Sequence, residues 1–324
     1  MSAGSRLTAS SQSDHELTAS DLAVVIPTWA RSEKLDITLR GLQEQTEQGF
    51  EIVVVVDGLD QELPDLPEAR VLRQQHAGPG AARNRGVSAT DRRLILFIND
   101  DMVPTRDLVA CHLRRHRDHP ADEVAVLGRV MWHPLVPNDR LHRWLDWSGA
   151  LFDFASMRSI PGDDPGWGRF YSCNVSMKRG FFLASGGFDP EFVFDYEDLD
   201  LAWRLAQHGL RLVYEPRAVV QHLHHYDWAA VQRRYVSRAG AERLMMSKHA
   251  WFRPWFHDQM AVAQSEPRAS GLWALAVDWV PRRAHGLRSK VARRADRHYR
   301  QRLAPVFLAA WEVSAPRDRG ASNS

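Results

Sequence analysis

Short runs of apolar residues without a polar interruption recur along the first third of the chain. They lie at 22–26 (LAVVI), 52–56 (IVVVV) and 94–98 (LILFI). Such runs are typical of strands that are buried on both faces of a sheet. Between the first two runs, leucines recur at helical spacing over residues 35–42. Strand, helix and strand in this order predict a parallel sheet with a right-handed crossover.

Weaker patterns continue this alternation to about residue 225. Short strands are predicted at 71–72, 124–127, 171–177, 212–214 and 218–220, and helices at 107–116 and from 195 onward. The pattern indicates an α/β domain over 21–227 and a helical, basic extension over 228–313. The Ser-, Ala- and Thr-rich residues 1–20 are predicted to be a disordered leader, and 314–324 a disordered tail.

One segment of the predicted domain shows little periodicity. Residues 131–170 are rich in Trp, Pro, Asp and Gly. We expect this segment to form the variable wall of a pocket, because loops on a rigid scaffold are common places for binding residues. Trp faces can stack on sugar rings, although Trp more often fills a core.

Composition narrows the class of protein. Of the 324 residues, 44% are hydrophobic and 25% charged, and the net charge is +2. These values are ordinary for a soluble globular protein and argue against nucleic acid as a partner. Cys111 and Cys173 lie far apart without metal-ligand spacing, so we expect reduced thiols.

The chain offers no clear membrane or export signal. No stretch is long enough to cross a membrane, and the N-terminus lacks the apolar core of a signal peptide. A cytoplasmic location is therefore expected. The many Arg residues between 282 and 302 are interpreted first as a solvated helix face, and second as a surface for peripheral contact with the inner face of the membrane.

Polar residues follow each of the three apolar runs. Thr28, Asp57 and the group 99–101 (NDD) come at or just after the ends of these runs. Parallel strands end at one edge of a sheet, where α/β folds bind ligands. Two or three oxygen donors there can hold a divalent cation and, through it, a diphosphate. The alternative is that these are ordinary turn residues.

Three further stretches have both a structural and a functional interpretation. Small residues in HAGPGAARNRG (76–86) lead into a helix whose free N–H groups could bind an anion. The alternative is a glycine-rich loop that only caps a structural helix. The acidic DYEDLD (195–200) suits a helix N-terminus. Clustered histidines at 222–225 suggest a metal, although a polar loop is commoner.

Taken together, the motifs resemble family 2 glycosyltransferases of the GT-A fold. They are VVIPTWAR (24–31), VVDG (55–58), HAGPGAARNRG (76–86), LFINDDMVP (96–104), GGFDPEF (186–192), YEDLDLAWRL (196–205) and VVQH (219–222). The resemblance implies a Rossmann-like mixed, mostly parallel central sheet flanked by helices, with the helical extension following it. It also implies a nucleotide-sugar donor, a divalent Mn²⁺ or Mg²⁺ ion and an inverting transfer.

The resemblance carries the family's donor and metal residues over to this chain. The implied donor-binding residues are Pro27, Thr28, Asp57, Arg83, Asn99 and Asp100. Asp57 resembles the aspartate that contacts the nucleobase, which favours a uridine donor. Asp101 and His222 are the implied metal ligands. The chain departs from the family's DxD motif at Asn99, a weaker ligand than a carboxylate.

The resemblance also supplies catalytic and acceptor residues. Asp198 is the expected general base, with Glu197 beside it. Asn174, Gly187 and Trp167 are the expected acceptor- or sugar-binding residues. Processive members carry QxxRW, and this chain has LAWRL instead, so a single addition to a glycan, lipid-linked or small-molecule acceptor is expected.

Two other functions are alternatives to a glycosyltransferase. A nucleotidyltransferase needs a glycine-rich basic loop after the first strand, and PTWARSEK fits this poorly. A non-catalytic nucleotide-sugar or glycan-binding protein on the same fold is favoured only by Asn99. The presence of Asp101, Asp198 and His222 argues against it.

Overall fold

A mixed eight-stranded sheet forms the centre of the protein, in the strand order β3-β2-β1-β4-β7-β6-β8-β5. The computed structural model describes residues 16–29, 32–60, 63, 66–157, 164–279 and 285–314. Its strands are β1 (Leu22–Thr28), β2 (Glu51–Asp57), β3 (Arg70–Gln74), β4 (Leu94–Ile98), β5 (Met102–Pro104), β6 (Val124–Trp132), β7 (Asn174–Lys178) and β8 (Arg211–His222).

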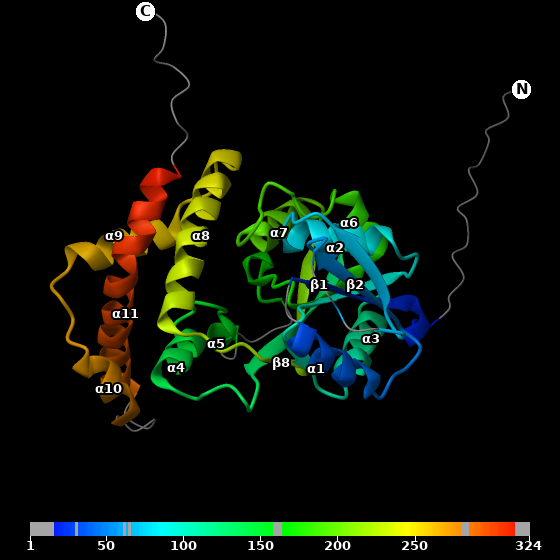
Figure 1. The fold of residues 1–324 in the computed structure, drawn as a ribbon, viewed down its shortest axis with the longest axis horizontal. Coiled ribbons are helices and arrows are strands. Elements are labelled where there is room, and N and C mark those ends of the chain that lie inside the picture. The colour runs from blue at the N-terminus through cyan, green and yellow to red at the C-terminus, as the bar shows by residue number, and fades with distance from the viewer. Residues whose placement is uncertain are drawn as a thin grey trace, which may run out of the picture.

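Helices flank the sheet, and a second group of helices gathers beside it (Figure 1). Those of the domain are α1 (Ser32–Gln43), α2 (Pro79–Ser88), α3 (Leu108–Asp118), α4 (Arg140–Trp147), α5 (Phe154–Met157), α6 (Arg179–Ala184) and α7 (Glu197–Gln207). Short 3₁₀ turns occur at η1 (Ala19–Asp21) and η2 (Trp167–Arg169). The extension consists of α8 (Trp228–Lys248), α9 (Trp255–Ser265), α10 (Leu272–Trp279) and α11 (His285–Val313).

The three apolar runs form the core strands of the sheet. β1 pairs in parallel with β2 on one side and β4 on the other. Every residue of β1 and β4 is buried, as expected for strands covered on both faces. Leu35, Leu39 and Leu42 of α1 are buried against the same core. The predicted strand–helix–strand unit and its parallel pairing are confirmed.

The second half of the sheet mixes directions. β7 runs antiparallel between β4 and β6, and β5 runs antiparallel to β8. The strand predicted at 171–177 begins only at Asn174. The two strands predicted at 212–214 and 218–220 are one long strand, β8, because an irregularity between Gly128 and Arg129 of β6 shifts their pairing without breaking it.

The end of the predicted disordered leader takes part in the fold. Residues 16–20 are described, and Ala19 is buried within η1. Residues 1–15 and all but the first residue of the predicted tail lie outside the described residues.

A buried polar network joins α3 to β7. His112 contacts Ser176 Oγ through Nδ1 at 2.8 Å and Asn174 Oδ1 through Nε2 at 3.0 Å. His116 Nε2 lies 2.9 Å from the same Ser176 hydroxyl, and its Nδ1 lies 3.1 Å from Lys178 Nζ. Burial lowers the pKa of both histidines, so the network is built from neutral imidazoles.

Acidification below pH 6.5 is expected to destabilise the fold through this network. Burial lowers the pKa of His112 from 6.5 to about 4. The unfolded chain therefore takes up the proton first, and folding stability falls as the pH drops from 6.5 towards 4. At about 1.4 kcal/mol per pKa unit, the loss from this one group is about 2 kcal/mol at pH 5.

Unfolding curves at pH 7.5 and pH 5 measure this loss. His112→Gln should reduce the dependence of folding stability on pH, because an amide does not titrate. His208→Gln, at an exposed histidine, serves as the matched control. An unchanged pH slope in His112→Gln would contradict the prediction.

The helical extension and α4 together enclose a second hydrophobic core. Buried aromatic and aliphatic residues from α4, α8, α9 and α11 form it, among them Trp144, Tyr235, Met260, Leu303 and Phe307. Within the described part of the chain, no helix combines the length and the apolar character that crossing a bilayer requires.

Several of the basic residues predicted to lie on a solvated face have partners in the extension. Arg294 and Arg302 lie over the rings of Trp273 and Trp228. Arg300 Nε donates to Asp296 at 2.7 Å. Part of this positive charge therefore stabilises the packing of α11. Peripheral contact with a membrane stays a prediction, and nothing in the described residues adds to it.

Candidate active site

The carboxyl ends of β1, β2 and β4 open into one pocket of about 1040 Å³. Its lining brings together most of the predicted site residues: Pro27, Thr28, Asp57, Arg83, Asn99, Asp100, Asp101, Glu197, Asp198 and His222. The convergence predicted from the strand ends is therefore confirmed. Residues of the predicted 131–170 wall line the pocket too, among them Ser148, Phe152, Asp153 and Phe170.

Asp57, at the end of β2, is buried and holds the loop that follows β3. Its carboxylate accepts hydrogen bonds from Gln74 Nε2 and the main-chain N–H of Ala77, both at 2.8 Å, and from the N–H of Gly78 at 2.9 Å. His76 Nδ1 lies 2.9 Å away as a fourth partner. The two oxygens therefore each have two partners, which fills the capacity of a carboxylate.

Trp29 adds a flat surface to this end of the pocket that sequence reasoning missed. It follows β1 directly, is 52% exposed and stacks on His76 with ring centroids 5.2 Å apart. The sequence could not identify it, because its exposure and its stacking on His76 appear only in the folded chain.

Arg83 connects the strand ends to the first turn of α7. Its guanidinium donates to Asn99 Oδ1 at 2.8 Å and lies 3.6 Å from Glu197 Oε1. The group is almost fully buried, and its Nε and Nη1 have no hydrogen-bond partner. A buried cation with free donors is suited to an anionic ligand. Asn99 thus serves as an acceptor for Arg83.

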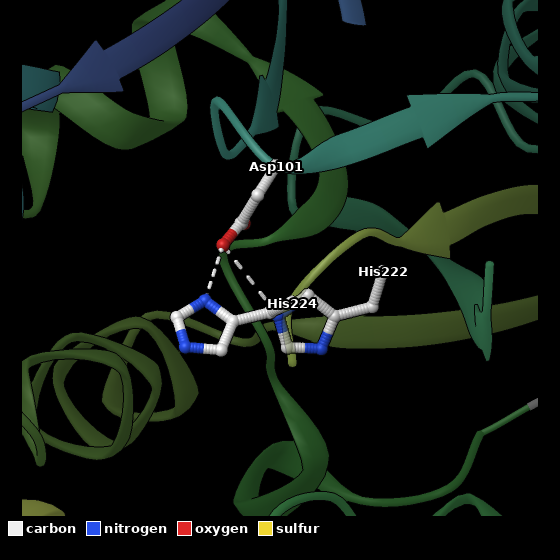
Figure 2. A group of neighbouring side chains, drawn as sticks. All are labelled: Asp101, His222 and His224. Carbon is white, nitrogen blue, oxygen red and sulfur yellow. Dashed lines mark hydrogen bonds and ion pairs between the residues drawn. The ribbon is translucent and has the colours of Figure 1, made fainter. Parts of the chain in front are cut away.

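Asp100 and Asp101 face different partners. Thr28 Oγ1 donates to Asp100 at 2.7 Å, and Thr38 Oγ1 donates to its main-chain oxygen at 2.9 Å. Asp101 Oδ2 instead lies 3.0 Å from His224 Nδ1 and 3.7 Å from His222 Nε2 (Figure 2). The turn after β4 therefore aims one carboxylate back into β1 and the other at the end of β8.

Asp101, His222 and His224 can together hold a metal ion. Each offers one ligand atom, and these atoms all lie within 4.8 Å of one another. His222 is fixed by stacking on Trp132, with the rings 9° from parallel. Burial lowers the pKa of His224, which favours the neutral imidazole that metals need. His224 was missed as a ligand, although it lies in the histidine cluster visible in the sequence.

Glu197, which is buried, and Asp198, which is partly exposed, begin α7 and form an acidic pair in the pocket lining. Asp198 Oδ2 accepts the N–H of Ser172 at 2.9 Å, and its Oδ1 has no hydrogen-bond partner. Burial, and then the charge of Asp198, raise the pKa of Glu197 to about 7, against the opposing effect of Arg83. Burial also raises the pKa of Asp198. Such a pair is suited to proton transfer near neutral pH.

The three residues predicted to bind acceptor or sugar lie outside the pocket lining, so the structure adds no support to that prediction. Asn174 is fully buried, and its amide is engaged by Arg129 O, Ala218 O and His112. Gly187 lies in a turn with φ of 71°, a conformation that favours glycine. Trp167 packs edge-on against Trp251. A Trp or a Gly in a motif fills space or shapes a turn as readily as it binds a ligand.

The far side of the pocket is formed by the helical extension, for which the sequence predicted no role in the site. α8 contributes Ala230, Arg233, Arg234, Ser237 and Arg238, the segment before α9 contributes Phe252, and α9 begins with the lining residues Trp255 and Phe256. The α8 residues recur at helical spacing, so one face of α8 borders the pocket. Sequence reasoning missed this wall, because only tertiary packing brings α8 to the sheet edge.

Comparisons with known proteins agree with this architecture. Residues 19–239 match the family described as "Glycosyltransferase like family 2". The mannosyltransferase PcManGT from Pyrobaculum calidifontis, solved with GDP-Man and Mn²⁺, superimposes with a TM-score of 0.55 at 16% identity, covering 91% of this chain and 86% of that one. This likeness concerns the fold, which is the predicted GT-A fold.

Curated relatives found by sequence similarity are also named as glycosyltransferases. The pre-mycofactocin glycosyltransferase of Mycobacterium tuberculosis is 30% identical over 226 residues, covering 65% of this chain and 45% of that protein. The validoxylamine A glucosyltransferase of Streptomyces hygroscopicus is 28% identical over 226 residues, covering 58% and 52%. The chain thus spans about half the length of these relatives.

Proposed function

The chain belongs to the family 2 glycosyltransferases, and on that premise we propose that it transfers one sugar from a nucleotide-diphosphate donor to an acceptor hydroxyl with inversion. The observation that supports this most is the shared pocket. It contains three side chains that could hold a metal ion and, at the start of α7, a carboxylate pair of raised pKa.

In the proposed reaction the acceptor oxygen attacks the anomeric carbon as the bond from that carbon to the diphosphate breaks. Asp198 takes the hydroxyl proton on Oδ1, its oxygen without a hydrogen-bond partner. Ser172 N–H holds the other oxygen and so orients the carboxylate. Arg83 directs its free donors toward the charge that develops on the leaving group.

The donor would bind along the ends of β1 and β2. Trp29 and His76 offer a stacked surface for a base. Uridine is the proposed base, from the place of Asp57 in the family motif. Because the Asp57 carboxylate is already fully engaged, a direct contact with a base requires His76 to give way.

The proposed metal site has one carboxylate and two imidazoles. Imidazole suits transition metals, whereas Mg²⁺ prefers oxygen ligands, so this donor set favours Mn²⁺ over Mg²⁺. When bound, the ion would neutralise charge on the donor diphosphate. The acceptor, of glycan, lipid-linked or small-molecule type, would enter beside the wall formed by α8 and the start of α9.

A panel of UDP-, dTDP- and GDP-sugars tests the proposal. Each donor is incubated with the protein and Mn²⁺, and hydrolysis or transfer is followed by release of nucleotide. Turnover of at least one donor is expected. Donor binding without turnover, across acceptors of several classes, would instead support the non-catalytic alternative.

A further inference from the structure

Two residues directly before the catalytic pair adopt an unfavourable backbone conformation. Asp195 has φ of 69° and Tyr196 has φ of 68°, and these are the non-glycine residues with positive φ in the described ranges. A residue with a Cβ rarely adopts this left-handed region. Two in succession persist only where the surrounding structure holds them, and such strain tends to occur at functional sites. The Asp195–Tyr196 step therefore needs an external support.

Arg238 of α8 supplies the first part of that support. Its Nε donates to Asp195 Oδ2 at 2.9 Å, and its Nη1 donates to the main-chain oxygen of Ala150 at 2.9 Å. The side chain is 3% exposed, and its guanidinium lies 4.1 Å from the centre of the Phe256 ring. Burial would raise the pKa of Asp195, but the charges of Arg238 and Arg234 lower it, so the pair stays ionised.

Glu242, one turn further along α8, supplies the second part. It is fully buried and accepts the hydroxyl of Tyr196 at 2.6 Å. It also accepts the N–H groups of Phe256 and His257, at 2.7 and 2.9 Å. Residues four apart lie on one helix face. That face of α8 therefore holds both residues of the strained step and the beginning of α9.

We propose that Arg238 and Glu242 are positioning residues: by holding the Asp195–Tyr196 step, they aim Glu197 and Asp198 into the pocket. This inference rests on the proposed function. It makes the helical extension part of the active site. If Asp195 and Tyr196 relaxed to a right-handed conformation, the first turn of α7 would rotate, and Asp198 would lose its alignment with Ser172 N–H.

The remainder of α7 has independent anchors. Leu201 and Leu205 are fully buried in the main core. Arg204 donates to the main-chain oxygens of Ser185 and Gly187 at 2.6 and 2.7 Å, and Asp200 lies 2.8 Å from His249 Nε2. Loss of one contact from α8 should therefore disturb the direction of the carboxylates without displacing the helix.

Tyr196→Phe is the sharpest test, because it removes one hydroxyl and keeps the ring against Phe252. With the donor found in the panel, kcat for hydrolysis should fall about 10- to 100-fold, the range expected for a small misplacement of catalytic groups. The KM for donor and the affinity for Mn²⁺ should change less than about twofold. Tyr235→Phe is the matched control, because the buried Tyr235 hydroxyl has no hydrogen-bond partner.

Arg238→Lys and Arg238→Met form a second pair. Lys keeps the charge facing Asp195 but lacks the planar fork, so it should retain more kcat than Met. Hydrogen exchange over 195–200 should rise in Tyr196→Phe and in both Arg238 variants but not in Tyr235→Phe. If Arg238→Met does not fold, Tyr196→Phe and Arg238→Lys still decide the question.

The possible results distinguish a failure of the positioning role from a failure of the proposed function. A wild type that turns over no donor would overturn the proposed function. A wild type that is active, with Tyr196→Phe matching Tyr235→Phe in kcat and in hydrogen exchange, would overturn the positioning role alone. A rise in donor KM at constant kcat would overturn it too, since it would place these residues in donor binding.

Discussion

Asp198→Asn is expected to lower donor turnover at least about 10³-fold while leaving donor affinity unchanged, since a positioned general base contributes about 10²- to 10⁴-fold. The amide keeps the shape of the side chain and can still accept the N–H of Ser172, but it cannot take a proton. Initial rates with saturating donor, together with donor titration by calorimetry, measure the two quantities separately.

The pH profile of the wild type adds a second measurement to this prediction. Both carboxylates of the Glu197–Asp198 pair have raised pKa values, and that of Glu197 is about 7. Burial and the charges of Asp198 and Asp195 raise the pKa of Glu197, whereas the charge of Arg83 opposes the rise. A base must be ionised to act, so log kcat should rise with pH through the titration of the pair and level off above it. We assign the titration to the pair as a unit.

Asp36→Asn is the matched control for Asp198→Asn. Asp36 lies on α1, is 43% exposed and pairs with Arg40. The same change of carboxylate to amide there should leave turnover unaltered. Loss of donor affinity in Asp198→Asn, in parallel with turnover, would show that Asp198 binds donor and is not the base.

Asp101→Ala is expected to weaken Mn²⁺ binding by about 100-fold or more, beyond the 10- to 100-fold that outer-shell partners contribute. Asp101 Oδ2 is the atom that both histidines face (Figure 2). Without it two imidazoles would remain, with no negative charge to balance the ion. Donor binding should be lost with the metal, because the ion is proposed to join the diphosphate to the protein.

Chelation provides the corresponding experiment on the unaltered protein. EDTA should abolish turnover, and Mn²⁺ should restore it more fully than Mg²⁺. His224→Ala should weaken Mn²⁺ binding, whereas His225→Ala, at the exposed neighbouring histidine, should not. Nucleotide-sugar binding that survives both EDTA and Asp101→Ala would refute a metal-dependent site.

The core strands and the sheet edge could be predicted from sequence because their signals are local. The run LILFI at 94–98 coincides with β4 residue for residue. Buried parallel strands need uninterrupted apolar residues, and their polar ends share one edge by topology. Asp101 and Asp198 were identified by their motifs, and the structure places both in the pocket lining.

The errors arose where a residue's role depends on what surrounds it. Asn174 was predicted to bind acceptor, yet its amide completes the buried network of α3 and β7. His224 and Trp29 were missed, since no pattern distinguishes a site residue from a polar loop or an exposed aromatic. Burial and geometry, which decide such roles, are properties of the folded chain.

The sequence by itself determined the GT-A fold, the parallel strands and the positions along the chain of the residues proposed as metal ligand and base. These follow from hydrophobic periodicity and short motifs, which are local in the chain. Only the tertiary structure decided that α8 borders the pocket and holds the Asp195–Tyr196 step. Arg238 lies 43 residues after Asp195, and their ion pair forms only because packing buries the Arg238 guanidinium beside that carboxylate. No local pattern encodes a contact of that kind.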